Sequence, residues 1–135
     1  MPDSSVLVVY REQASGRRAL AAAAALEAPL TVVALAPKEV RSARCGIYTP
    51  ALDLAVHAAA ERELDTARQL LGARARSAEF VVLETKRDQY LAAWAVGAGF
   101  TTALIGARRK LLGVGPRDLA ARALSRAGLE VRNIQ

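Results

Sequence analysis

The sequence is poor in the residues that build disulfide-bonded and metal-bound domains. Among 135 residues there is one cysteine, Cys45, and one histidine, His57. A single cysteine cannot close an intramolecular disulfide, which excludes the small secreted proteins that depend on such bonds. It also excludes cysteine-rich zinc and iron–sulfur sites.

Long apolar runs are missing as well. The most apolar stretch, residues 19–26, is short and rich in alanine, and Glu27 and Pro29 follow it. A membrane-spanning helix needs about 20 apolar residues. The first residues lack the basic and apolar regions of a signal peptide. We therefore expect a cytoplasmic protein that has no membrane partner.

What the sequence does contain suits one folded domain. Hydrophobic residues make up 53% of the chain, enough to fill a core. The length matches a single domain, because most domains have about 100–150 residues. We therefore expect residues 1–135 to form one domain.

Positive charge is concentrated near the end of the chain. The net charge is +6. The balance over residues 1–99 is +1, from 12 basic and 11 acidic residues, and over residues 100–135 it is +5, from seven basic and two acidic residues. Most of the basic residues are arginine, which binds phosphate in a bidentate way. An anion-binding end of the molecule and a codon bias toward arginine and alanine both explain this pattern.

Short apolar runs alternate with amphipathic segments along the whole chain. Such runs are typical of strands buried on both faces, and the segments between them are typical of helices. The predicted strands are 6–10, 30–36, 79–84, 101–106 and 129–135, and the predicted helices are 17–27, 51–76, 89–99 and 118–128. Ser15 is the expected cap of the first helix, and Gly97 or Gly99 ends the third. This order predicts an α/β fold with a five-stranded parallel sheet between two layers of helices.

Ligands of such folds bind beyond the carboxyl ends of the strands. Three segments meet there in the predicted fold, namely 10–16, 36–50 and 106–118. We name nine candidate ligand-binding residues in them: Tyr10, Arg11, Ala36, Gly106, Arg108, Arg109, Lys110, Gly113 and Gly115.

The last of the three segments is the best candidate for an anion site. Three basic residues follow a strand there, and Gly113 and Gly115 precede a helix whose N-terminal amides favour anions. The spacing matches neither common glycine-rich nucleotide motif. Asp118, at the expected cap of that helix, competes with a phosphate for the same amides. A solvated basic loop is therefore the alternative.

Convincing catalytic groups are scarce. His57 lies on the predicted long helix without a neighbouring cysteine, aspartate or second histidine, and we interpret it as a surface or partly buried side chain. Cys45 lies in the loop 37–50 close to two arginines, which favour a reactive thiolate, although an ordinary thiol explains it too. Trp94 is spaced as a core residue. With no acid/base pair or activated nucleophile, we expect no enzyme.

The whole chain resembles the universal stress protein family. The similarity rests on VLVVYREQASGRRAL at residues 6–20, on TTALIGARRKLLGVG at 101–115 and on DLAARALSRAGLEVRNIQ at 118–135. The resemblance implies a five-stranded parallel α/β domain of the adenine nucleotide alpha hydrolase-like class. It also implies a homodimer, in which the last strand often pairs across the interface.

One branch of that family binds ATP through Gly-x2-Gly-x9-Gly-[Ser/Thr] and an aspartate at the end of the first strand. Gly106 matches the first glycine of this motif. Arg109 replaces the second, Asp118 and Leu119 replace the final pair, and Tyr10 or Arg11 stands in place of the aspartate. The resemblance therefore implies a member that has lost the usual ATP motif.

The leading hypothesis is a non-enzymatic stress or regulatory protein that does not bind ATP in the family's usual manner. The alternative is a switch that binds a nucleotide, such as ATP or another adenine nucleotide, or another anion through the loop 106–118. An enzyme lacks the necessary groups, and specific nucleic-acid binding lacks a recognisable module. We expect a homodimer that pairs through the C-terminal strand, and we name no certain cofactor.

Overall fold

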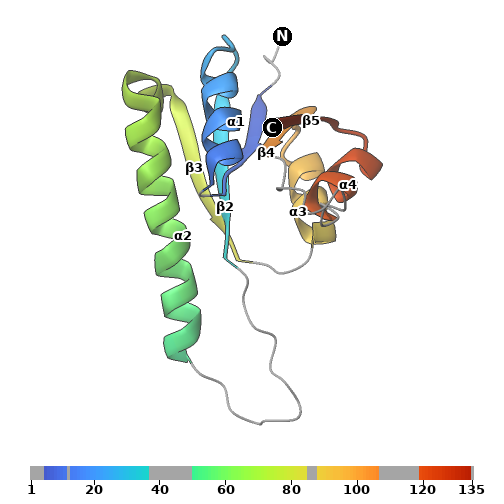
Figure 1. Cartoon of the computed structure of the whole chain (residues 1–135). Helices are drawn as coiled ribbons and strands as arrows, with labels where there is room; N and C mark the ends of the chain where they lie inside the picture. The colour runs from blue at the N-terminus through green and yellow to red at the C-terminus, as the bar shows by residue number, and fades with distance from the viewer. Residues whose placement is uncertain (1–4, 12, 37–49, 85–87, 107–118, 135) are drawn as a thin grey trace, which may run out of the picture.

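The five strands form one parallel sheet in the order β3-β2-β1-β4-β5 (Figure 1). The computed structural model describes residues 5–11, 13–36, 50–84, 88–106 and 119–134. The strands are β1 (Val6–Val9), β2 (Leu30–Leu35), β3 (Ala78–Leu83), β4 (Thr102–Gly106) and β5 (Glu130–Ile134). The predicted α/β fold with a five-stranded parallel sheet is therefore confirmed. None of the helices in the described part of the chain has the length and apolar character that a membrane span requires.

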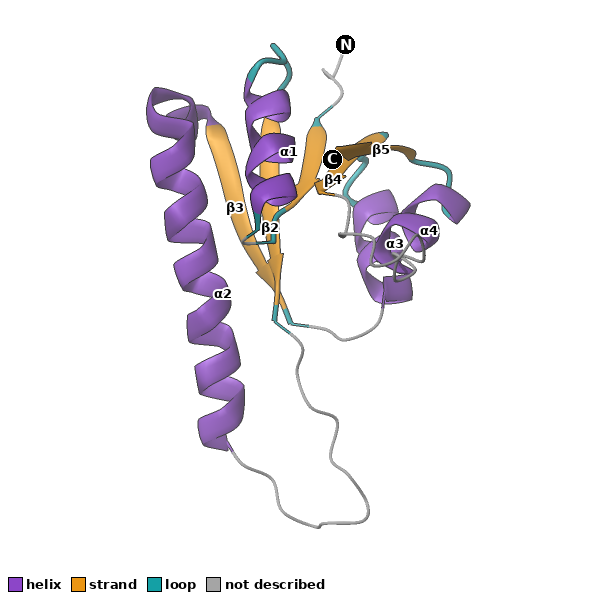
Figure 2. Cartoon of the chain, viewed as in Figure 1, coloured by secondary structure: helices purple, strands orange, loops and turns teal. Residues whose placement is uncertain are grey.

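Helices cover both faces of the sheet, as expected for parallel strands (Figure 2). The helices are α1 (Ala14–Ala24), α2 (Pro50–Leu71), α3 (Asp88–Gly97) and α4 (Leu119–Arg126), and a short 3₁₀ helix, η1 (Gly72–Ser77), follows α2. Val6 and Val8 pack in a cluster with α1 and α2, whereas Leu7 and Val9 pack with α3 and α4. This alternation along β1 divides the core into two halves.

The two edge strands are less buried than the central three. Every residue of β1 is buried, and in β2 only Leu35 is partly exposed. In β3 only Leu83 is buried, and in β5 no residue is. Both edge strands therefore keep surface that the remainder of the described chain does not cover.

Two helices end at a glycine with a left-handed backbone. Gly99 has a φ of 87° and Gly128 a φ of 102°. The next amide in each case reaches back five residues, from Phe100 to the Ala95 carbonyl and from Leu129 to the Leu124 carbonyl. This pattern is the Schellman motif, in which glycine adopts the conformation at no steric cost. The expectation that Gly97 or Gly99 ends the third helix is met by Gly99.

Three predicted helix boundaries were wrong. Helix α1 begins at Ala14 with Gln13 as its N-cap, so Ser15 lies inside the helix and does not cap it. Helix α1 also ends at Ala24, three residues before the predicted end at Glu27. Helix α2 ends at Leu71 because Gly72, with a φ of 57°, changes the backbone to the 3₁₀ helix η1. Leu70, near the end of this helix, is an exposed leucine.

Arg74 of η1 fixes the connection between α1 and β2. Its guanidinium donates to the carbonyls of Leu26 and Ala28, at 2.9 and 2.5 Å, and to the Ser77 hydroxyl at 2.7 Å. These carbonyls follow the end of α1 and have no helical partner. The Arg74 guanidinium therefore joins η1 to the connection between α1 and β2.

Candidate functional site

The connections of the sheet reverse direction between β1 and β4. The chain leaves β1 toward β2 on one side and leaves β4 toward β5 on the other. In open α/β sheets, ligands bind at the carboxyl edge next to such a reversal. The described residues at this edge include Tyr10, Arg11, Gln13, Gly16 and Gly106.

Tyr10 and Ala36 belong to the core at this edge. Each continues the ladder by one residue beyond its strand, since the Tyr10 amide donates to the Val33 carbonyl and the Ala36 amide to the Leu83 carbonyl, both at 2.9 Å. Tyr10 is 1% exposed and Ala36 is 2% exposed, and both pack in the cluster under α1 and α2. The Tyr10 ring therefore fills space beneath α1.

Gly106 lies directly beneath the first turn of α1. A Cβ on Gly106 would lie 2.5 Å from the Gly16 nitrogen and 2.6 Å from the Ser15 carbonyl carbon. A Cβ on Gly16 would overlap the carbonyl oxygen of Arg11. The backbone of α1 therefore rests on the end of β4, and this approach requires Gly106, whereas Gly16 is required for the close turn from Arg11 into α1. The sequence showed both glycines but gave no sign that they meet.

Gln13 supplies a buried polar atom at the same edge. As the N-cap of α1 it accepts from the Arg17 amide through its carbonyl, at 3.0 Å, and its side chain makes no capping bond. Its side-chain nitrogen Nε2 is buried and has no hydrogen-bond partner among the described residues. Buried amide donors are nearly always paired. Gln13 was not among the predicted site residues, because a lone glutamine in a turn carries no motif.

The other candidates are distributed as follows. Arg11 is partly exposed, and its carbonyl accepts from the Gln13 amide at 2.8 Å. The remaining five candidates lie outside the described residues, as do Cys45 and Asp118: Arg108, Arg109, Lys110, Gly113 and Gly115. The structure thus brings Tyr10, Arg11 and Gly106 to one edge of the sheet, and Ala36 to the end of the neighbouring strand.

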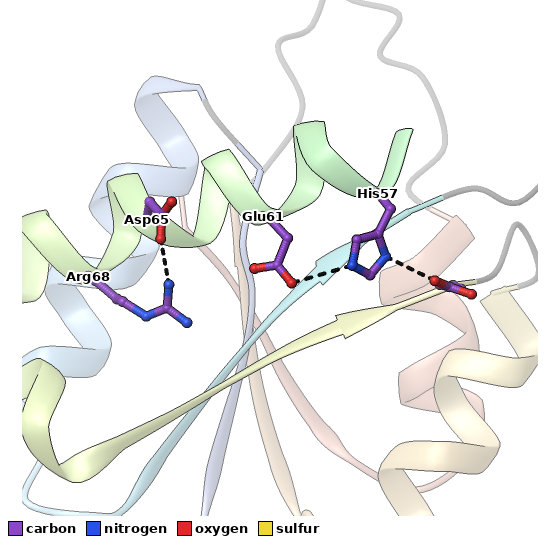
Figure 3. A network of polar contacts seen from close by, with 5 residues as sticks. His57, Glu61, Asp65 and Arg68 are labelled. Carbon is purple, nitrogen blue, oxygen red and sulfur yellow. Dashed lines mark hydrogen bonds and ion pairs between the residues drawn. The ribbon is translucent and has the colours of Figure 1, made fainter. Parts of the chain in front are cut away.

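His57 lies between two carboxylates where α2 passes the end of β3 (Figure 3). Its Nδ1 is 2.9 Å from Glu84 Oε1, and its Nε2 is 3.4 Å from Glu61 Oε1. The interpretation of His57 as a partly buried residue is confirmed. A search for partners near His57 in the sequence could not find Glu84, because Glu84 is 27 positions away.

These contacts do not form a site for chemistry. All three side chains are about half exposed, and one turn further along α2, Asp65 pairs with Arg68 (Figure 3). Among the described residues, no group of three or more His, Cys, Asp or Glu is placed to hold a metal ion. The contacts join α2 to the end of an edge strand.

Part of the C-terminal positive charge lines a groove between α3 and α4. Arg122 and Arg126 are exposed on α4 and border a groove of about 580 Å³, whose other lining residues are Gln89 and four alanines. Arg132 is different, because its Nε is 3.2 Å from Glu130 on the same strand. The charge is therefore spread over the surface of α4 and β5.

Solved structures similar to this fold are universal stress proteins. A protein of that family from Burkholderia pseudomallei aligns over 97% of this chain and 95% of its own, at 22% identity and a TM-score of 0.69. A universal stress protein from Archaeoglobus fulgidus aligns over 98% and 93%, at 20% identity and a TM-score of 0.69. The structure from Archaeoglobus fulgidus in complex with dAMP covers both chains fully, at 18% identity and a TM-score of 0.67.

Comparison by sequence gives a different result. No protein-family model and no curated protein matches the chain. Identities near 20% establish the fold and leave the ligand open. The chain therefore has the universal stress protein fold.

Proposed function

We propose that this chain is a non-enzymatic regulatory protein of the universal stress type that does not hold ATP in that family's usual manner. The observation that carries the proposal is the filled carboxyl edge between β1 and β4. Tyr10, in place of an aspartate, is buried in the core, and the first turn of α1 rests on Gly106. A nucleotide needs open backbone at such an edge, and here side chain and helix occupy the described part of it.

Titration calorimetry with ATP tests this proposal. We expect no saturable heat from the wild-type protein up to about 1 mM ATP. A Kd in the micromolar range, lost in Gly113→Ala and in Arg108→Ala but kept in the surface control Arg122→Ala, would contradict it. Arg122→Ala changes the net charge by the same amount as Arg108→Ala. The comparison therefore separates a general electrostatic effect from the loss of a specific binding site.

One observation favours the alternative of a nucleotide or anion switch. The buried Nε2 of Gln13 lacks an acceptor, and an incoming ligand with an oxygen or a ring nitrogen supplies one. Solved structures of this fold include complexes with dAMP and with cAMP. The alternative predicts co-purified nucleotide, visible as adenine absorbance, and at least tenfold weaker binding in Gln13→Met.

We further propose that two copies associate through β5 in the cytoplasm. This strand pairs with β4 on one side only within the described sheet, and its residues are exposed or partly exposed. An unpaired strand edge presents amides and carbonyls to a second strand regardless of side chains. The side chains of Glu130 and Arg132 pair with each other on β5. The side chain of Val131 packs against the core.

A further inference from the structure

A pocket lies at the amino edge of the sheet, opposite the edge discussed above. Its volume is about 240 Å³, and its walls come from the starts of β2 and β3 and from the end of α3. Helix α3 ends here at the turn around Gly99, and Phe100 then leads into β4. The end of the helix and the turn after it therefore border the beginnings of β2 and β3.

An aromatic pair forms one wall of this pocket. The rings of Trp94 and Phe100 lie 5.6 Å apart, tilted by 42°. Phe100 is buried and Trp94 is partly buried against the same half of the core. Their packing fixes both rings, so the wall is formed before any ligand arrives.

The facing wall carries polar groups from two neighbouring strands. Thr31 and Glu79 are register partners of β2 and β3, and both lie on the face of the sheet that α3 covers. Thr31 is the one buried polar residue of the described chain, with 6% exposure. The hydroxyl-bearing Ser77 also lines the pocket. No ion pair within the described residues engages Glu79.

We propose that this pocket binds a small organic ammonium ion with a flat apolar body, held between the Glu79 carboxylate and the Trp94–Phe100 wall. A carboxylate selects a positive charge, and an aromatic wall adds a cation–π attraction as well as apolar contact. The hydroxyl of Thr31 accepts from one of the remaining ammonium protons. The Ser77 hydroxyl is already engaged by Arg74, from whose guanidinium it accepts and to whose carbonyl it donates.

The size and charge of the site narrow the ligand class. Pockets for drug-sized ligands usually measure about 300–1,000 Å³, so this pocket fits a molecule with a single ring. The chain carries a net charge of +6, which repels cations in general. Selection of a cation therefore has to come from Glu79 itself and not from the overall field of the protein.

Trp94 makes the test direct, because it is the one tryptophan in the sequence. Its fluorescence is followed during titration with three probes that share a phenyl ring and have similar size: phenethylamine, 2-phenylethanol and phenylacetate. We expect a saturable change with phenethylamine, at least tenfold weaker binding of the neutral alcohol and no binding of the anion. The Trp94 indole N–H signal in an NMR spectrum shifts with the same apparent Kd.

Two variants separate a site from a general charge effect. Glu79→Gln lets the amine and the alcohol bind equally well. Glu130→Gln removes the same charge from an exposed position at the start of the other edge strand, and it leaves the preference unchanged. Thermal unfolding of both variants checks that the fold is kept.

Three results would overturn the proposal: no saturable change up to 10 mM phenethylamine, equal affinity for amine and alcohol in the wild type, or equal losses in the two variants. None of these results bears on ATP binding, because the pocket and the β1–β4 edge lie at opposite ends of the strands.

Discussion

Gly106 lies against the backbone of Gly16, so closely that a Cβ on Gly106 would come within 2.5 Å of the Gly16 nitrogen. This contact joins the end of β4 to the first turn of α1, two segments separated by 90 positions. It determines where α1 begins and what space remains at the carboxyl edge.

The first prediction concerns that contact. Gly106→Ala places a methyl group against backbone atoms that cannot rotate away, so we expect a loss of about 1–3 kcal/mol in the free energy of unfolding, or more. Gly97→Ala is the matched control, because a Cβ there meets nothing within 4 Å and alanine favours a helix by up to about 1 kcal/mol. Urea unfolding measures both variants. Equal midpoints for the two would show that the contact is not tight.

The second prediction uses the buried nitrogen of Gln13. Gln13→Met keeps the size and flexibility of the side chain but removes a donor that has no partner. An unpaired buried polar group costs about 1–3 kcal/mol, so we expect this variant to be more stable than the wild type in ligand-free protein. Gln89→Met, at an exposed position of α3, serves as the control. A destabilised Gln13→Met protein would mean that the amide has a partner in solution.

Much of the fold could be predicted because the central strands are continuous apolar runs in the sequence. The apolar runs of β1 and β2 end within one residue of the predicted limits, since both strands are buried on both faces. Helix starts were harder to place. Ser15 is a good cap by itself, but the approach of α1 to Gly106 moves the cap to Gln13. A tertiary contact overrides a local preference of about 1 kcal/mol there.

The candidate site was less predictable for the same reason. Tyr10 was chosen for its place at the end of a strand, and the alternation of the ladder turns its ring into the core. Glu84 and Gln13 could not be selected, since their importance depends on partners far along the chain or on a missing partner. Spacing within one element carries none of that information.

The third prediction concerns the contact between α2 and the end of β3. A double-mutant cycle of His57→Ala and Glu84→Ala should give a coupling of about 0.2–1 kcal/mol, because both side chains are nearly half exposed and solvent screens them. Asp65 with Arg68 on the same helix gives a second exposed pair as a reference. A coupling above about 3 kcal/mol would mean that the His57–Glu84 pair is more buried from solvent than it is in the structure.

The fourth prediction tests pairing through β5. The Glu130 amide donates inward, to the Thr101 carbonyl of the β4 side at 2.8 Å. Successive residues of a strand point their amides to opposite sides, so the amides of Val131 and Asn133 point away from β4. Asn133→Pro therefore removes an outward donor and keeps every bond between β4 and β5.

Sedimentation equilibrium measures the effect of that substitution. We expect a dimer for the wild type and for Asn133→Ala, which keeps the amide, and a monomer with unchanged circular dichroism for Asn133→Pro. Arg132→Pro removes an inward amide instead, so it should weaken the sheet itself and lower the unfolding temperature. A dimer that persists in Asn133→Pro would place the interface on another surface, since proline removes one of the two outward amide donors of β5 from the ladder.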